Sequence, residues 1–412
     1  MSGSRLQGLT TLQHGSGLIA VLLIAALVGA TGLLAQGDLA ARARARAHSL
    51  SVRALAQARS ALIGYATSYA ERHPGEAYGY LPCPDTGNTG STPIGACGAR
   101  GQGAIGRLPY RTLGLTDLRD GWGQCLWYAV AGSMKHNPKP LMLNWDSPGQ
   151  FRPRSTSGEP LSPEHARIAA VVFAPSVPLQ GQSRPVSSGR RCPGSDSSAS
   201  DIAHFLDGDY PTAFATSLDV HQGTADGLPR NDLIAWVTVD EVFGALRRRR
   251  DFAPRMDETI STAAGAVASR LADHDFIERH ATLTGALFVG TLPDAAALDL
   301  PPGHADAHDN WRDQFRFAAC ADGSACITVS RTGPPSTETC RGALLFGGER
   351  ARHGPVQQLR NTPGERADPA QYFEGLNPTH LTDGVPSFTG ARNFTLPPSG
   401  QAASEDVIRC LN

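Results

Sequence analysis

The most pronounced pattern in the chain is an apolar stretch close to its first residue. Gly17 to Leu34 reads GLIAVLLIAALVGATGLL, and no Asp, Glu, Lys or Arg occurs between Arg5 and Asp38. As a helix, these residues would extend for about 27 Å, which matches the hydrocarbon thickness of a bilayer. A helix that packs with one face on the core of a soluble protein normally has a polar stripe on its other face, and this segment has none. The pattern therefore predicts a transmembrane helix over residues 16–36.

The residues that follow indicate that this helix is retained in the mature chain. From Leu39 to Arg72 the sequence is rich in Ala, Leu, Arg and Gln, which favour helices, and Gly64 is its only Gly or Pro. An apolar helix that continues without a break into a long amphipathic helix is typical of an anchored stem. The alternative is a secretory signal cleaved after Ala30 or Ala35, which gives no reason for this continuity.

The start of the apolar stretch resembles the leader of type IV prepilins, in which a polar, basic leader and a Gly precede the apolar helix. Residues 13–17, Gln-His-Gly-Ser-Gly, fit this pattern. The resemblance implies a leader over residues 1–15, cleaved between Gly15 and Ser16 by a prepilin peptidase. Most pilins have Glu at the fifth mature position, where this chain has Ala20. Some minor pilins that cap filaments also lack that Glu, so the resemblance implies a position at a filament tip.

Four further motifs follow in order, the first within the stem helix and the others after it. They are ALIGYA at Ala61–Ala66, LPCPDT at Leu81–Thr86, LPYRTLGL at Leu108–Leu115 and DGWGQCLWYAV at Asp120–Val130. Together they resemble a proteobacterial family of type IV prepilin-like proteins. The resemblance implies a minor pilin or pseudopilin-like component of a type IV pilus or type II secretion filament. It also implies other pilins or pseudopilins, the prepilin peptidase and the inner membrane as partners, with a periplasmic domain that is extracellular in a filament.

The rest of the chain matches itself in three blocks that keep the same order. The matching pairs are Asp120–Ala129 with Asp309–Ala318, Ile168–Arg184 with Gly342–Arg360, and Asp201–Thr212 with Asp368–Thr379. Three ordered matches are hard to obtain by chance, although the connecting loops differ in length. They predict two pilin-like units, residues 37–245 with the stem helix and residues 246–412, in which Trp122 corresponds to Trp311 and Phe205 to Tyr372.

Each unit is expected to contain a helix, a long loop, an aromatic strand and a buried strand. The helices are predicted at residues 52–72 and 257–279, and the continuous apolar stretches at 168–174 and 342–346 are typical of strands buried on both faces. Residues 231–250 predict a strand followed by a short helix. Pro, Ser and Gly are frequent in 146–165 and 185–200, which predicts loops. The fold class is therefore α+β, with helices packed on antiparallel sheets.

The eight cysteines form no C-x-x-C pair with zinc-like spacing, and in an exported protein their even number predicts disulfides. Buried free thiols are the alternative. Cys83 and Cys97 flank a short Gly- and Thr-rich loop, and closing it would contribute about 3 kcal/mol. This pairing leaves Cys125 and Cys192 to each other. Three pairings stay open for the remaining cysteines, Cys320, Cys326, Cys340 and Cys410.

The composition argues against several classes of function. The net charge of −1 provides no basic excess for nucleic acid, and the sequence contains neither a phosphate-binding loop nor a dinucleotide fingerprint. Asp85-Thr86-Gly87 matches the aspartic-protease triplet, but the chain has no second copy to supply the other carboxylate. We therefore expect a protein that is not an enzyme and has no cofactor.

Other polar clusters are each better explained by structure than by chemistry. His304, His308 and Asp309 are a possible metal cluster, but Pro301-Pro302-Gly303 precedes them and favours a solvated loop. His274 and His280 are six residues apart and would point to different sides of a helix, so surface histidines are expected. The arginines of 247–250 are expected at a solvated helix end. No catalytic, cofactor-binding or metal-ligating residue is predicted.

Two other functions stay open at this point. One is an anchored binding module, for carbohydrate or another protein, that never enters a filament. The other is an exported hydrolase, for which the sequence offers no constellation of catalytic residues. Arg184 and Arg360, each preceded by a Gln two residues earlier, are interpreted as structural residues that bind either a loop carbonyl or the blocks that begin at Asp201 and Asp368.

Overall fold

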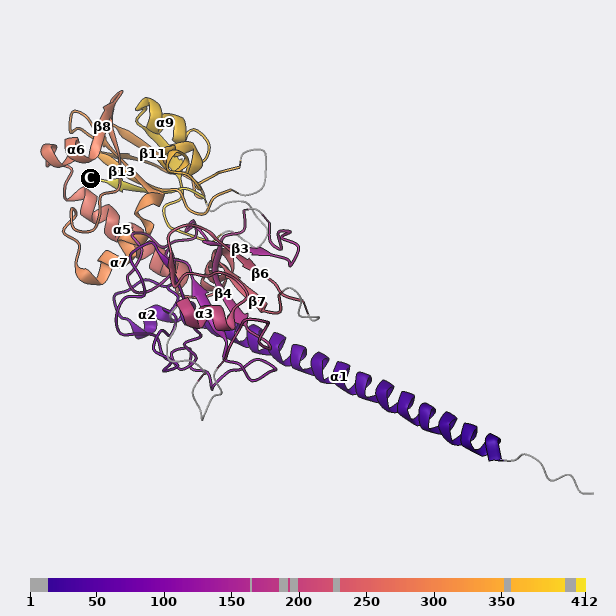
Figure 1. The fold of residues 1–412 in the computed structure, drawn as a ribbon. Coiled ribbons are helices and arrows are strands. Elements are labelled where there is room, and N and C mark those ends of the chain that lie inside the picture. Colours follow the sequence, from indigo (N-terminus) through magenta and orange to yellow (C-terminus); the bar gives the residue numbers. More distant parts are fainter. Residues whose placement is uncertain are drawn as a thin grey trace, which may run out of the picture.

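The structure is a computed structural model that describes residues 14–163, 165–184, 192, 199–224, 230–351, 357–396 and 405–412, with side chains described in the first helix for 19–28 and from 39 onward. The predicted leader, residues 1–15, lies almost entirely outside this part of the chain. The structure is α+β and contains three sheets. A long helix projects from a body of two packed units (Figure 1).

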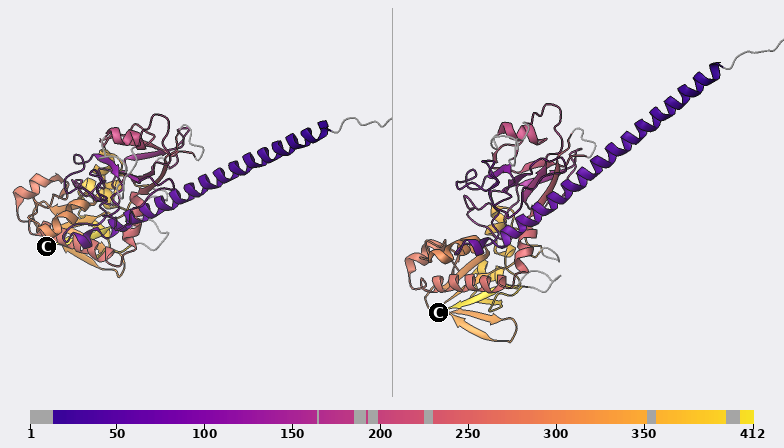
Figure 2. Two further views of the ribbon diagram at one scale, coloured as in Figure 1. Left: turned by 60° about the horizontal axis from the view of Figure 1, so that its bottom comes forward. Right: turned by 90° about the horizontal axis from the view of Figure 1, so that it is seen from below.

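The projecting helix is α1, His14–Thr67, which continues after a short break into α2, Tyr69–Arg72. Its length follows from the Ala-rich sequence, which has no proline between its ends. Only its C-terminal part packs on the body, and the other end extends away from it (Figure 2). There Leu55 and Leu62 are buried in the main core, whereas charged side chains such as Arg53 face outward.

The predicted transmembrane helix over residues 16–36 is overturned. Within the described part of the chain, no helix has an apolar stretch long enough to cross a membrane. The predicted single-pass location in the inner membrane is corrected by the same finding.

The first unit contains a seven-stranded sheet in the order β5-β1-β2-β4-β3-β6, with β7 also paired to β4. Its strands are β1 Gly103–Arg107, β2 Trp127–Val130, β3 Phe151–Arg154, β4 Ile168–Ala174, β5 Ala213–Phe214, β6 Leu218–His221 and β7 Leu233–Thr238. Every residue of β4 is buried, because α1 packs on one face and α3, Ala199–Phe205, belongs to the core on the other. Helix α4, Val239–Arg247, completes this unit.

The second unit contains a five-stranded sheet, β15-β13-β10-β9-β8, and a three-stranded sheet, β12-β11-β14. The strands are β8 Ala281–Thr284, β9 Leu287–Thr291, β10 Phe315–Cys320, β11 Ile327–Arg331, β12 Thr337–Cys340, β13 Gly342–Phe346, β14 Ser387–Gly390 and β15 Val407–Leu411. The helices are α5 Phe252–Ala268, α6 His274–His280, α7 Pro302–Trp311, α8 Pro363–Ala367 and α9 Asn377–Asp383, with 3-10 turns η1 Arg312–Gln314 and η2 Pro369–Gln371.

The two units share an arrangement of strands. The first unit has four successively paired strands in the order β1, β2, β4 and β7. The second unit has four successively paired strands in the order β9, β10, β13 and β15. All of these pairs are antiparallel. Helix α1 packs against β4 and β7, as α5 packs against β13 and β15. The predicted strands 168–174 and 342–346 are β4 and β13, in equivalent places.

Several local predictions differ from the structure. The sheets are not purely antiparallel, since β3 pairs with β6 and β11 with β14 in parallel after long crossover connections. Strand β3 lies in the predicted loop 146–165, and the predicted helix 257–279 is broken into α5 and α6. The proposed boundary at residue 245 falls in the last turn of α4.

The units are joined by a short segment of the first unit that lies against the second. The backbone N–H of Leu143 donates to Asn310 Oδ1 at 2.8 Å, and Asn144 Nδ2 donates to the Asn310 carbonyl at 2.8 Å. The ring of Trp145 meets that of Trp311 edge-on with centroids 4.6 Å apart. All of these groups are buried, so the two units form one continuous core rather than two separate domains.

Candidate functional site

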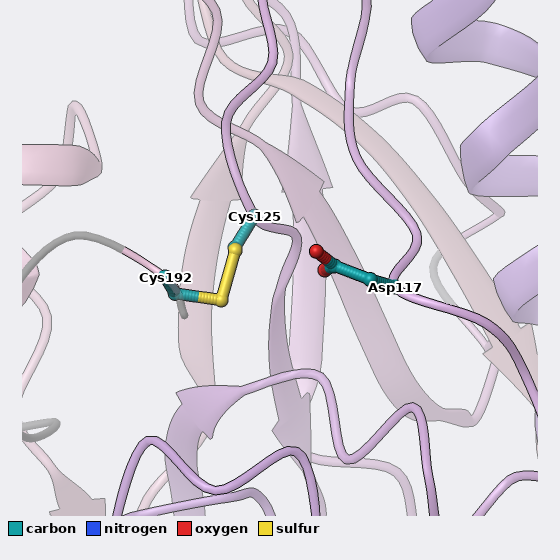
Figure 3. A group of neighbouring side chains, drawn as sticks. All are labelled: Asp117, Cys125 and Cys192. Atoms are coloured by element: carbon teal, nitrogen blue, oxygen red, sulfur yellow. A yellow bond between two sulfur atoms is a disulfide. The ribbon is translucent and has the colours of Figure 1, made fainter. Parts of the chain in front are cut away.

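The described residues include one group with the spacing of a metal site, formed by Asp117, Cys125 and Cys192 (Figure 3). The two cysteines are joined in a disulfide, and a sulfur in that state lacks the thiolate charge that metal binding needs. The Asp117 carboxylate is paired with Arg119, whose Nη2 lies 2.8 Å away. The group is therefore a disulfide beside an ion pair, and its chemistry does not suit a metal ion.

All eight cysteines are paired in four disulfides, which confirms the prediction of disulfide bonding. The pairs are Cys83–Cys97, Cys125–Cys192, Cys320–Cys326 and Cys340–Cys410. Each lies within one unit. Among the pairings left open for the second unit, the structure has the one that links β12 to the C-terminal strand β15.

Asp85 organises the loop that contains the Asp-Thr-Gly triplet. Its carboxylate accepts hydrogen bonds from the backbone N–H groups of Gly87, Thr89 and Gly90 at 3.0, 3.2 and 2.6 Å. The loop has positive φ at Asn88 and Gly90, as such a tight turn requires. A carboxylate occupied by three backbone donors is a structural loop anchor.

The histidines of 304–308 do not lie in a loop, contrary to prediction, but in α7. Pro302 is tolerated there because the first residues of a helix need no N–H donor. His308 is buried and its Nε2 lies 2.9 Å from the Pro293 carbonyl, and burial lowers its pKa. Asp309 accepts from the backbone N–H of Ala295 at 2.8 Å. Both side chains therefore fix the loop that precedes α7.

The other histidine and arginine candidates also contact neighbouring groups of the chain. His274 lies 3.2 Å from Glu278 at the surface, and the ring of His280 contacts that of Phe276. Of the four arginines at 247–250, Arg247 pairs with Glu349 of the second unit. Arg249 pairs with Glu71 and Asp251, which raises the pKa of Arg249. Two of the four arginines that were predicted to be solvated, Arg247 and Arg249, therefore form ion pairs with other side chains of the protein.

Arg184 and Arg360 occupy equivalent positions and have equivalent partners. Each donates from Nη2 to the Gln two residues earlier, at 2.8 Å for Gln182 and 3.1 Å for Gln358. Each also donates from Nε to the carbonyl of the residue that precedes the matched aromatic, His204 in the first unit and Gln371 in the second, at 2.9 and 2.6 Å. These contacts are structural.

Phe205 and Tyr372, the matched aromatic pair, are both buried under these arginines. The two matched tryptophans differ more. Trp122 is half-buried in the turn before β2, whereas Trp311 is buried at the end of α7 before β10. They precede equivalent strands but lie in different local structures.

A buried carboxyl pair occurs at the same place in both units and was not predicted. The backbone N–H of Asp207 donates to Asp232 at 2.8 Å, and that of Glu374 donates to Asp406 at 3.0 Å. Burial raises the pKa of Asp232 well above its usual value. Burial and the neighbouring Asp406 likewise raise the pKa of Glu374. Extending the repeat to the Asp-Leu-Ile at the start of β7 and the Asp-Val-Ile at the start of β15 would have revealed the pair.

The longest stretch of exposed apolar side chains in the described chain lies on the projecting part of α1. Its side chains between residues 19 and 28 are 60–66% exposed at Ile19, Val21, Leu22, Leu23, Ile24, Leu27 and Val28. At 100° per residue these positions surround the helix on every side. A helix that is apolar all round is normally buried, so this surface is the strongest candidate for an interface among the described residues.

Gly15 and Ser16, the predicted processing site, lie in the first turns of α1, and the structure describes only their backbone. In comparisons with protein-family models, curated proteins and solved structures, nothing matches this chain.

Proposed function

We propose that this chain is a pilin-like structural subunit of a type IV pilus or type II secretion filament. In this proposal, the projecting part of α1 packs against the helices of neighbouring subunits, and the two-unit body is displayed at the filament surface. The observation that supports it most is the apolar surface of residues 19–28, which is exposed on all sides of the helix. Packing against other apolar helices would remove this surface from water.

The position of the body supports the same assignment. It packs only on the C-terminal part of α1, which leaves the rest of the helix accessible to other helices (Figure 2). A body of two fused units is also large for a subunit that repeats along a filament. Together with Ala20 at the place where most pilins have Glu, this favours the tip of the filament.

The disulfides favour a function outside the reducing cytosol. All eight cysteines are paired, and one bridge ties the C-terminal strand to β12. Disulfides of this kind persist in oxidising compartments and are rare in cytosolic proteins. A prepilin peptidase that acts at Gly15 is the processing enzyme that this function requires.

A photo-reactive amino acid placed at Leu23 tests the packing of α1 in the native cell. We expect a covalent adduct that mass spectrometry identifies as another pilin-like subunit or a second copy of this chain. Leu283 on β8 is the matched control, because it is similarly apolar and is 56% exposed on the second unit. Adducts from Leu283 alone would contradict the proposal and favour a binding module outside any filament.

A further inference from the structure

A pocket of about 450 Å³ lies between the two units, at the edge where β3 faces α8. Its walls come from segments that are far apart in the sequence. The first unit contributes Phe151 and Arg152 of β3 and Arg167 before β4, and the second contributes Arg360 and Arg366. This volume is in the range of pockets that hold small ligands.

The lining residues carry more positive than negative groups. Four guanidinium groups line the pocket, together with His165, and Asp146 is the one carboxylate among the lining residues. Carboxylates outside the lining pair with three of these arginines: Asp240 lies 2.5 Å from Arg167, Asp219 2.7 Å from Arg152, and Asp313 3.8 Å from Arg366. Asp146 is 3% exposed, and its Oδ2 is held by Arg360 Nη1 at 2.9 Å and by Gln314 Nε2 at 3.1 Å. The Asp146 carboxylate is therefore held in the wall of the pocket, and the partners of Arg152 and Arg366 lie outside the lining.

The arginines at the mouth retain donors for a ligand. The Arg152 side chain is 56% exposed, and its Nε donates to Asp219, which lies outside the lining, at 2.7 Å. Arg366 is fixed from below, because it donates to the carbonyls of Arg360 and Asp146 at 3.0 Å each. A guanidinium held by backbone carbonyls and a more exposed one in the same lining are suited to bind two oxyanion groups.

We propose that this pocket binds a small organic anion with two or more carboxylate or phosphate groups. Arg366 and Arg152 would each bind one oxyanion group, and the remaining volume would hold the body of the ligand. The proposal concerns the body of the protein and does not depend on the filament function proposed above.

Isothermal titration calorimetry on the full chain, with its disulfides intact and at low ionic strength, tests this proposal. Citrate and pyrophosphate are the probes, since one presents carboxylates and the other phosphates, and glucose is the neutral control. We expect saturable binding of at least one anion, and the tighter one identifies the preferred group. Binding should weaken as salt is added, because a partly exposed charge pair is screened. Binding of neither anion would overturn the proposal.

Substitutions separate a defined pocket from general attraction to a basic surface. Arg152→Gln and Arg366→Gln should each weaken anion binding about tenfold, the effect of losing one charged hydrogen bond. The matched control is Arg154→Gln, which removes the same charge from the same strand and also contacts Asp219, yet does not line the pocket. We expect it to change binding less than twofold. An equal loss in Arg152→Gln and Arg154→Gln would show that no specific site exists.

Discussion

The guanidinium carbon of Arg360 lies 4.3 Å from the ring centroid of Tyr372. In the first unit, Arg184 lies 5.2 Å from the centroid of Phe205. The same contact therefore occurs at equivalent positions of two sequences that otherwise share few residues. Its reappearance indicates that the arginine fixes the crossover segment against the sheet in this fold.

The two arginines should differ in their contribution to stability. Arg360 is 1% exposed and is the nearest cation to the buried Asp146, at 2.9 Å, whereas Arg350 and Arg167 lie 3.5 and 3.8 Å from its other oxygen. Arg360→Gln breaks this buried ion pair and should lower the free energy of unfolding by about 3–5 kcal/mol. Arg184 mainly binds carbonyl groups and is half-buried, so Arg184→Gln should cost about 1–3 kcal/mol. Urea unfolding measures both. Arg279→Gln, at an exposed position of α6, should stay within about 0.5 kcal/mol.

The contribution of each disulfide of the second unit to the free energy of unfolding should increase with the length of chain that it closes. The Cys340–Cys410 bridge spans 70 residues, and its removal by a double Cys→Ser substitution should cost about 4 kcal/mol. The Cys320–Cys326 bridge spans 6 residues, and its removal should cost about 2 kcal/mol. Thermal unfolding of the two double variants gives the comparison. A greater loss from the shorter bridge would show that loop closure does not determine their contribution.

The buried carboxyl pair of the second unit should make stability depend on pH. Because the pKa of Glu374 is raised, the folded protein keeps a proton that the unfolded chain releases. The free energy of unfolding should therefore fall as pH rises above the usual carboxyl range, from pH 5 to 8. Glu374→Gln should make this fall shallower, and Glu278→Gln, at an exposed site, should not. Parallel pH profiles for parent and Glu374→Gln would contradict this explanation.

The contact between the units should protect the backbone of Leu143 from solvent exchange. Asn310→Ala removes the acceptor of that N–H and the donor to the Tyr80 hydroxyl at 2.9 Å, all in buried surroundings. Hydrogen exchange followed by mass spectrometry should show faster exchange in the peptide that contains Leu143. Asn393→Ala, at an exposed position, should leave that peptide unchanged. Unaltered exchange in Asn310→Ala would mean that other contacts hold the segment.

Local patterns predicted the parts of the fold that depend on local sequence. The strands at 168–174 and 342–346 have the predicted bounds, because burial on both faces demands a continuous apolar stretch. The Cys83–Cys97 bridge closes a short loop and was predictable from spacing. Helix α7 was missed because Pro301-Pro302-Gly303 is as typical of a loop as of a helix start.

Features that depend on distant residues were not predictable. The parallel pairing of β3 with β6 joins residues 67 apart, as in Phe151 and Leu218, and no local periodicity encodes it. The arginine-lined pocket depends on the packing of the two units, which places Arg152 of the first and Arg366 of the second in one lining. The transmembrane prediction relied on hydropathy alone, and the described part of α1 does not support it.

N-terminal sequencing of the mature protein from its native cell tests the central claim most directly. A pilin-like subunit processed by a prepilin peptidase should begin at Ser16, directly after Gly15 and at the start of the apolar part of α1. A Gly15→Leu variant should then accumulate with its leader uncleaved. A mature chain that begins at Thr31 or Gln36 would instead show removal of a secretory signal, and it would contradict assembly through α1.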